Sequence, residues 1–114
     1  MKRDYLVYLD DILNAMDNAD EFVAGMDYVQ FENDIRTTFA VTRALEIVGE
    51  ATKRLPPDIR EKYPHIPWKD MAGMRDVIIH GYDNVNLQIV WDVIKRDIPR
   101  IRLQIQQILT DHEG

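Results

Sequence analysis

Isoleucines recur in the last quarter of the chain at alternating intervals of four and three residues. The members of this series are Ile94, Ile98, Ile101, Ile105 and Ile108. An α-helix has about 3.6 residues per turn, so this spacing places all of them on one side of a helix. The series therefore predicts an amphipathic helix, and other segments of the chain must supply the apolar surface against which it packs.

Similar periodicity indicates three earlier helices. We predict four main helices over residues 4–20, 31–55, 68–80 and 87–110. Pro56 and Pro57 end the second helix, and Pro67 suits the first turn of the third. Pro99 is expected to interrupt and kink the fourth helix.

No strand-like alternation is present, so the predicted fold class is all-α. The architecture is an antiparallel bundle of four main helices, with a short extra helical turn over residues 58–63 in the 56–67 connector. The expected buried stripe of the second helix is Phe39, Val41, Leu45, Val48, Ala51 and Leu55. Trp68 and Trp91 are expected to be core or interface anchors.

Length and composition favour one small globular domain. The chain has 114 residues, 46% of them hydrophobic, and no cysteine. We expect a single domain over residues 1–114, without disulfides or thiolate metal sites. The first residues lack the apolar run of a signal peptide, and no segment approaches the roughly 20 apolar residues of a membrane span. These features predict a soluble, cytoplasmic protein without a membrane partner.

The net charge of -6 is unevenly distributed along the chain. Residues 1–34 contain nine acids against Lys2 and Arg3, whereas the remaining 80 residues contain 12 bases and 11 acids. The acidity therefore belongs to the N-terminal third, and the rest of the chain can present a locally positive site. A cluster of Lys95, Arg96, Arg100 and Arg102 could bind phosphate or a partner, or could simply be solvated. The same alternatives apply to Arg36, Arg43 and Glu50, which recur every seven residues.

The motifs of common catalytic sites are missing: there is no Gly-rich phosphate loop, HExxH or GxSxG sequence. The three histidines are His65, His80 and His112, and their placement does not suit a zinc site. We therefore expect neither a metal nor a cofactor.

One segment concentrates polar groups with catalytic potential at the end of a predicted helix. This segment, MRDVIIHGY, covers residues 74–82. Asp76 and His80 are four residues apart, so the carboxylate can orient the imidazole and raise its pKa. Arg75 and His80 are five residues apart, about 140° around the helix axis, so they need not meet within one chain. If two copies pair through this helix, each can contribute to a composite site.

These residue types suit RNA cleavage by the ribose 2′-hydroxyl. The reaction needs an acid or base near neutral pH, a role that histidine fills. It also needs a cation to stabilise charge on the phosphate, and arginine is planar and always charged. No metal is required for this chemistry.

The motif resembles the R-x-x-x-x-H-x-Y signature of HEPN domains, as found in HepT-like toxins. Arg75, His80 and Tyr82 match it, and Asp76 occupies a position that is commonly polar in the family. The resemblance extends over residues 36–55, 63–82 and 90–101, and covers about 70 of the 114 residues.

This resemblance implies a metal-independent endoribonuclease toxin of the HepT/MNT type. Such domains form homodimers or higher oligomers that bring two motifs together at a cleft, with Arg75 and His80 as the catalytic pair and RNA as substrate. The implied partner is an MNT-type nucleotidyltransferase antitoxin that adenylylates the motif tyrosine, here Tyr82, and silences the toxin.

Simpler interpretations of the same residues remain open. His80 could have no role other than capping the carbonyls at the helix end. Arg75 could form a surface ion pair, and Tyr82 could be a packing residue. The alternative function is a non-catalytic nucleotide- or partner-binding module that works with a nucleotidyltransferase. A purely structural helical dimer would explain the apolar stripes but not the polar helix end.

Overall fold

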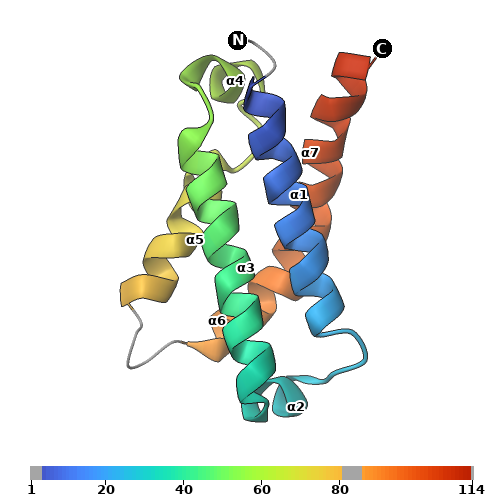
Figure 1. Cartoon of the computed structure of the whole chain (residues 1–114), viewed down its shortest axis with the longest axis vertical. Coiled ribbons are helices and arrows are strands. Elements are labelled where there is room, and N and C mark those ends of the chain that lie inside the picture. The colour runs from blue at the N-terminus through green and yellow to red at the C-terminus, as the bar shows by residue number, and fades with distance from the viewer. Residues whose placement is uncertain (1–3, 81–85, 114) are drawn as a thin grey trace.

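The chain folds into an all-α bundle whose long helices alternate in direction (Figure 1). The computed structural model describes residues 4–80 and 86–113, and the side chains of these residues except 4, 75–80 and 113. The four long helices are α1 (Asp4–Phe22), α3 (Ile35–Arg54), α5 (Trp68–His80) and α7 (Ile98–Glu113). Shorter helical segments are α2 (Tyr28–Asn33), α4 (Pro57–Lys62), α6 (Leu87–Asp92) and the π-helical η1 (Val93–Asp97). The predicted fold class is confirmed.

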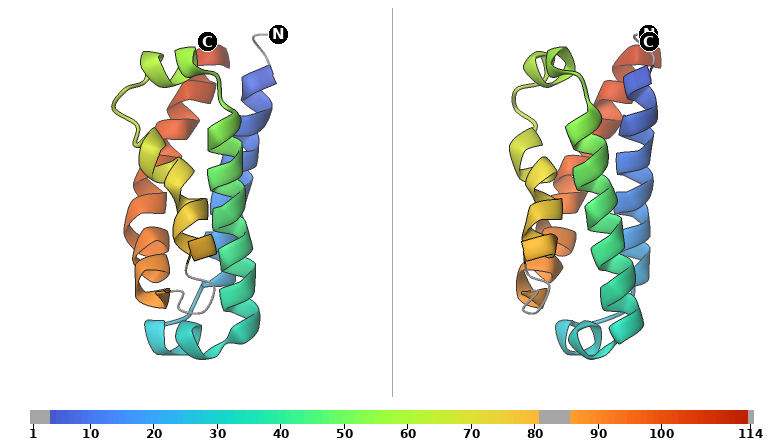
Figure 2. Two further views of the ribbon diagram at one scale, coloured as in Figure 1. Left: turned by 90° about the vertical axis from the view of Figure 1, so that its left-hand side faces the viewer. Right: turned by 60° about the vertical axis from the view of Figure 1, so that its left-hand side comes forward.

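The core lies between α1, α3 and α7, with α5 packed against α3 (Figures 1 and 2). The predicted isoleucine series is buried throughout, each member being at most 2% exposed. Leu9, Ile12 and Met16 of α1 are fully buried with it. The periodicity of the apolar residues therefore identified the surfaces that hold the bundle together.

The predicted helix over residues 31–55 is in fact two helices that meet at Asp34. This residue has an extended backbone, and its carboxylate accepts a hydrogen bond from the Thr37 N–H at 3.1 Å, so it is the N-cap of α3. Asp27 caps α2 in the same way, and Gln30 completes a capping box by accepting from the Asp27 N–H. Two cap residues thus set two helix starts.

The expectation that Phe39 belongs to the buried stripe of this helix is wrong, because its side chain is 73% exposed. The other five members of the stripe are buried. Phe39 precedes Val41 by two residues, which places it about 200° around the helix from the buried side.

Removal of the Asp34 cap should destabilise the protein. We expect Asp34→Ala to lower the free energy of unfolding by about 1 kcal/mol, because the Thr37 N–H loses its acceptor. Asp34→Asn should retain most of the stability, since the amide oxygen can also cap. Urea unfolding followed by circular dichroism measures both. Equal losses in the two variants would mean that the carboxylate charge, not the cap, stabilises this helix start.

The predicted fourth helix extends to Glu113 and is divided by the π-helical segment η1. Pro99 lacks an N–H, and its ring would collide with the Lys95 carbonyl in a regular α-helix. Just before Pro99, the Ile98 N–H donates to the Val93 carbonyl, five residues back. The widened turn accommodates the proline, and α6 and α7 are offset in direction (Figure 1).

The connector between α3 and α5 is packed rather than loose. Its helical turn is α4, which begins at Pro57, and Ile59 and Ile66 are buried. Arg60 donates to the Thr52 carbonyl at 2.7 Å, which satisfies an acceptor at the end of α3. The Trp68 indole N–H donates to the Tyr63 carbonyl at 2.9 Å. These bonds fix the point at which α5 begins.

Candidate active site

Helix α5 carries three of the four predicted site residues. Arg75, Asp76 and His80 lie in its C-terminal half, where the structure describes the helical backbone but not the side chains. Tyr82 lies outside the described residues. The backbone places Asp76 and His80 one turn apart, and Arg75 and His80 about 140° apart around the axis. The two predicted catalytic residues thus start from different sides of one helix.

The N-terminal half of α5 is anchored in the core. Trp68 is 6% exposed, Met71 is fully buried and Met74 is 9% exposed. These three residues recur at intervals of three and pack α5 against α3. Trp68 is therefore a core anchor, as predicted, and the polar motif begins directly after the last anchored residue, Met74.

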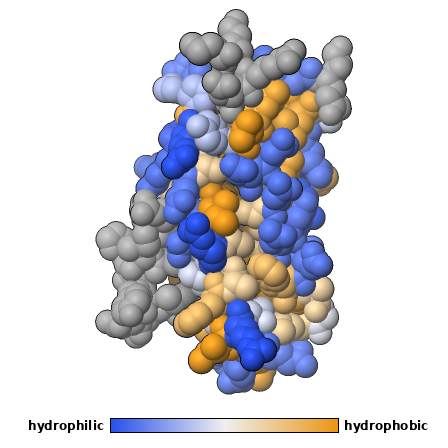
Figure 3. Space-filling model, viewed as in Figure 1, coloured by the Kyte–Doolittle hydropathy of each residue, from blue (hydrophilic) through white to orange (hydrophobic). Residues whose placement is uncertain are grey.

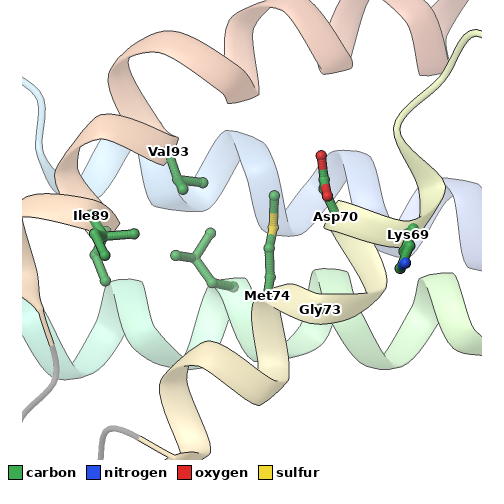
Figure 4. A pocket seen from close by; sticks show the side chains of 8 residues that line it. Lys69, Asp70, Gly73, Met74, Ile89 and Val93 are labelled. Carbon is green, nitrogen blue, oxygen red and sulfur yellow. The ribbon is translucent and has the colours of Figure 1, made fainter.

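An apolar groove of about 320 Å³ lies beside this part of α5 (Figure 4). It is lined by Leu45 of α3, Lys69, Asp70, Gly73 and Met74 of α5, Ile89 and Val90 of α6, and Val93 of η1. Lys69 and Asp70 lie at the end of the groove away from Ile89. His80 follows Gly73 by seven residues, about two turns along the same side of α5.

Helix α6 is held by an aromatic cluster. Trp91 of α6 packs on Phe31 and Tyr28 of α2, with ring centroids 5.2 and 6.0 Å apart. The Lys95 ammonium lies 4.9 Å from the Trp91 ring centroid. Burial, and then the hydrogen bond to Glu32, raise the pKa of the Tyr28 phenol. Trp91 is accordingly a packing anchor that joins α2 to α6.

The predicted basic cluster is largely engaged with neighbouring acids. Arg96 pairs with Asp92 at 3.4 Å and Arg100 with Asp97 at 3.5 Å. Arg102 pairs with Asp17 of α1 at 3.0 Å. Arg102 thus ties α7 to the acidic N-terminal helix, and the cluster as a whole is not a free cationic surface.

The polar stripe on α3 is an exposed ion-pair network. Arg43 lies 3.3 Å from Glu46 and 3.6 Å from Glu50, and its side chain is 60% exposed. Such surface pairs contribute little stability. The solvated-face interpretation of this stripe is supported.

Among the described residues there is neither a metal-binding cluster nor a membrane-spanning helix. No group of three or more His, Cys, Asp or Glu residues in the described part is arranged to hold a metal ion. None of the described helices is both long and apolar enough to cross a membrane.

The fold and the motif together define a helical bundle with an R-x-x-x-x-H sequence at the end of one helix. The sequence model of the family described as Ribonuclease HepT-like matches residues 12–108 of this chain. The chain therefore belongs to the HepT-like ribonuclease family.

Three relatives match the chain over nearly its whole length. Two proteins of Methanocaldococcus jannaschii, each named Putative RNase, are both 48% identical to it; the alignments cover 99% and 98% of this chain and 93% and 97% of the relatives. A Thermococcus cleftensis protein named Probable ribonuclease HepT is 42% identical over 95% of this chain and 98% of its own length. No solved structure matches the chain.

Proposed function

We propose that this protein is a metal-independent endoribonuclease toxin whose active site contains Arg75 and His80. The observation that carries the proposal is the R-x-x-x-x-H-x-Y motif at the end of α5 in a member of the HepT-like ribonuclease family. Two relatives at 48% identity, each named Putative RNase, add support.

The proposed reaction is transesterification within the RNA chain. His80 as base takes the proton of a ribose 2′-hydroxyl, whose oxygen then attacks the adjacent phosphorus. The bond from phosphorus to the 5′ oxygen of the next nucleotide breaks, and that oxygen takes up a proton from an acid. The products are a 2′,3′-cyclic phosphate and a free 5′-hydroxyl. Arg75 stabilises the negative charge that develops on the phosphate oxygens.

We propose that the working form is a homodimer with composite sites. Arg75 and His80 start from different sides of α5, so a cleft shared by two chains brings them together more readily than one chain does. Apolar side chains gather near the beginning of α3 (Figure 3). Ile35 and Phe39 of α3 are 70% and 73% exposed and lie one helical turn apart. Contiguous exposed apolar groups are typical of surfaces that bind another protein chain.

Regulation is proposed to act at Tyr82. An MNT-type nucleotidyltransferase antitoxin would transfer adenylate to its hydroxyl. Tyr82 follows His80 by two residues, so the added phosphate would lie near Arg75 and His80 and compete with the RNA phosphate. This would silence the toxin in the cytoplasm, where both proteins would act.

The first test is incubation of the purified protein with total RNA in excess chelator. We expect cleavage by the parent and a loss of roughly 100- to 10,000-fold in His80→Ala, because proton transfer by a positioned histidine contributes that much. His65→Ala is the matched control: His65 is an exposed histidine in the connector, and its removal should leave cleavage intact.

Two other outcomes would change the assignment. If His80→Ala cleaves as fast as the parent, His80 is not catalytic. If the parent does not cleave and intact-mass spectrometry finds no adenylate on it, the alternative of a non-catalytic nucleotide- or partner-binding module is favoured. Growth arrest on expression of the chain alone would independently support the toxin.

A further inference from the structure

The groove beside α5 has no role in the chemistry of Arg75 and His80. It lies immediately N-terminal to the motif, since Gly73 and Met74 line it and Arg75 follows. We propose that it is a nucleobase subsite, which receives one unstacked base of the RNA next to the cleaved phosphate. This inference rests on the proposed ribonuclease function and adds a specificity site to it.

The volume and lining of the groove suit one small group with apolar faces. Its volume of about 320 Å³ is at the lower end of the roughly 300–1,000 Å³ typical of small-molecule sites. Met74, Val90 and Val93 supply apolar walls from α5, α6 and η1. A base unstacked from single-stranded RNA is bound by such surfaces, because its faces need apolar or aromatic contact.

The polar residues of the groove complement a nucleotide. Figure 4 shows Asp70 and Met74 projecting to the same side of α5, with Val93 facing them. The Asp70 carboxylate can accept an N–H from the edge of a base. The Lys69 ammonium, on the adjacent residue, can bind a phosphate oxygen. Both side chains are exposed to solvent.

The distance to the motif also fits RNA. Gly73 and His80 are seven residues apart on one side of α5, which is about 10 Å along the helix axis. One or two nucleotides of single-stranded RNA span that interval. A protein partner fits the groove less well, since a stable interface needs about 800 Å² from each partner and not one small hollow.

Gly73 offers a clean way to block the groove. A Cβ atom added there would meet nothing within 4 Å, so a larger side chain can extend into the open space. Leucine and alanine are both better helix formers than glycine. Gly73→Leu should therefore fill the groove without unfolding α5, and Gly73→Ala is the matched control that leaves most of the space free.

The binding test is a titration with AMP, CMP, GMP and UMP, which the enzyme cannot cleave. The five methionines are labelled with ¹³C at their methyl groups, and Met74 is assigned through Met74→Leu. We expect the Met74 signal to shift and that of Met16, fully buried on α1, to stay. Gly73→Leu should bind roughly tenfold more weakly, because stacking of one base contributes about that factor. Gly73→Ala should bind almost as the parent does.

Asp70 gives the site a preference that can be measured. Adenine, cytosine and guanine carry an exocyclic amino group and uracil does not, so UMP should bind most weakly. Asp70→Ala should reduce the difference in affinity between UMP and the other three monophosphates, and the Met74 signal should still shift. Equal binding of all four monophosphates by the parent would exclude a hydrogen bond from an exocyclic amino group of the base to Asp70.

Three results would overturn the subsite. One is no Met74 shift up to about 10 mM monophosphate, where a site with a dissociation constant near 1 mM is mostly filled. Another is an equal shift with ribose 5-phosphate, which has no base. The third is conversion of a parent dimer to monomer by Gly73→Leu in sedimentation, which would assign the groove to a second copy.

The inference and the proposed function fail separately. RNA cleavage without a Met74 shift would refute the base subsite alone. A Met74 shift in a protein that cleaves no RNA would refute the ribonuclease and leave a base-binding site. If both hold, Gly73→Leu should raise KM for RNA roughly tenfold while kcat changes less.

Discussion

A mixture of Arg75→Ala and His80→Ala proteins, each inactive alone, is expected to regain about a quarter of the parent activity. In a dimer with composite sites, each site takes Arg75 from one chain and His80 from the other. Half of the dimers formed by random exchange contain one chain of each kind. Each of these has one complete site and one site that lacks both groups, which gives the quarter.

The same mixture tests the geometry of α5. If one chain supplied both groups to its own site, every chain in the mixture would lack one of them, and activity would stay at the level of the single variants. The measurement is the initial rate of cleavage of a fluorescent RNA after the chains have been unfolded together and refolded. A mixture of Arg75→Ala with the double variant is the control. Neither of its chains contains Arg75, so no complete site can form and the activity should stay at the level of Arg75→Ala alone.

The sequence predicted the start of α5 correctly because local signals mark the N-terminal half of this helix. Pro67 precedes the first residue, and Trp68, Met71 and Met74 recur at helical spacing. The isoleucine series was equally informative, since its period alone defines a buried side. Local periodicity was sufficient where one helix packs on one surface.

The break at Asp34 was missed although the sequence contains its signals. Asp27 and Gln30 have the spacing of a capping box, and Asp34 is a favourable N-cap residue. The apolar residues on both sides of Asp34 fit a continuous helix. Their periodicity therefore predicted a single helix although Asp34 is a favourable cap residue. Phe39 was misplaced for a related reason: hydrophobicity predicted burial, but its angular position on the helix does not.

The motif residues were predicted from sequence, whereas the groove could not be. Arg75, Asp76 and His80 lie within one segment of six residues, so their chemistry and their match to the family motif can both be seen in the sequence. The groove is built from Leu45, from residues 69–74 and from residues 89–93, which only the fold brings together. Its one local signal is Gly73, a glycine inside a helix, where this residue is unfavourable unless space is needed.

Phe31 and Phe39 provide a matched pair that separates folding from assembly. Phe31→Ala should lower the free energy of unfolding by about 3–5 kcal/mol, the usual cost of removing a fully buried phenylalanine. The loss also removes the ring on which Trp91 packs, at a centroid distance of 5.2 Å. Urea unfolding followed by tryptophan fluorescence measures this change, which is large beside the 5–15 kcal/mol that stabilises a typical domain.

Phe39→Ala removes the same side chain from a position that is 73% exposed, so the unfolding free energy of the monomer should change by less than about 0.5 kcal/mol. Its effect should instead appear in sedimentation, as a shift from dimer to monomer at equal protein concentration. Because composite sites need two chains, RNA cleavage should fall with the dimer fraction and recover at high concentration. A Phe39→Ala protein that remains dimeric at the lowest measurable concentration would place the dimer contact on another surface and leave the exposed ring without a role in assembly.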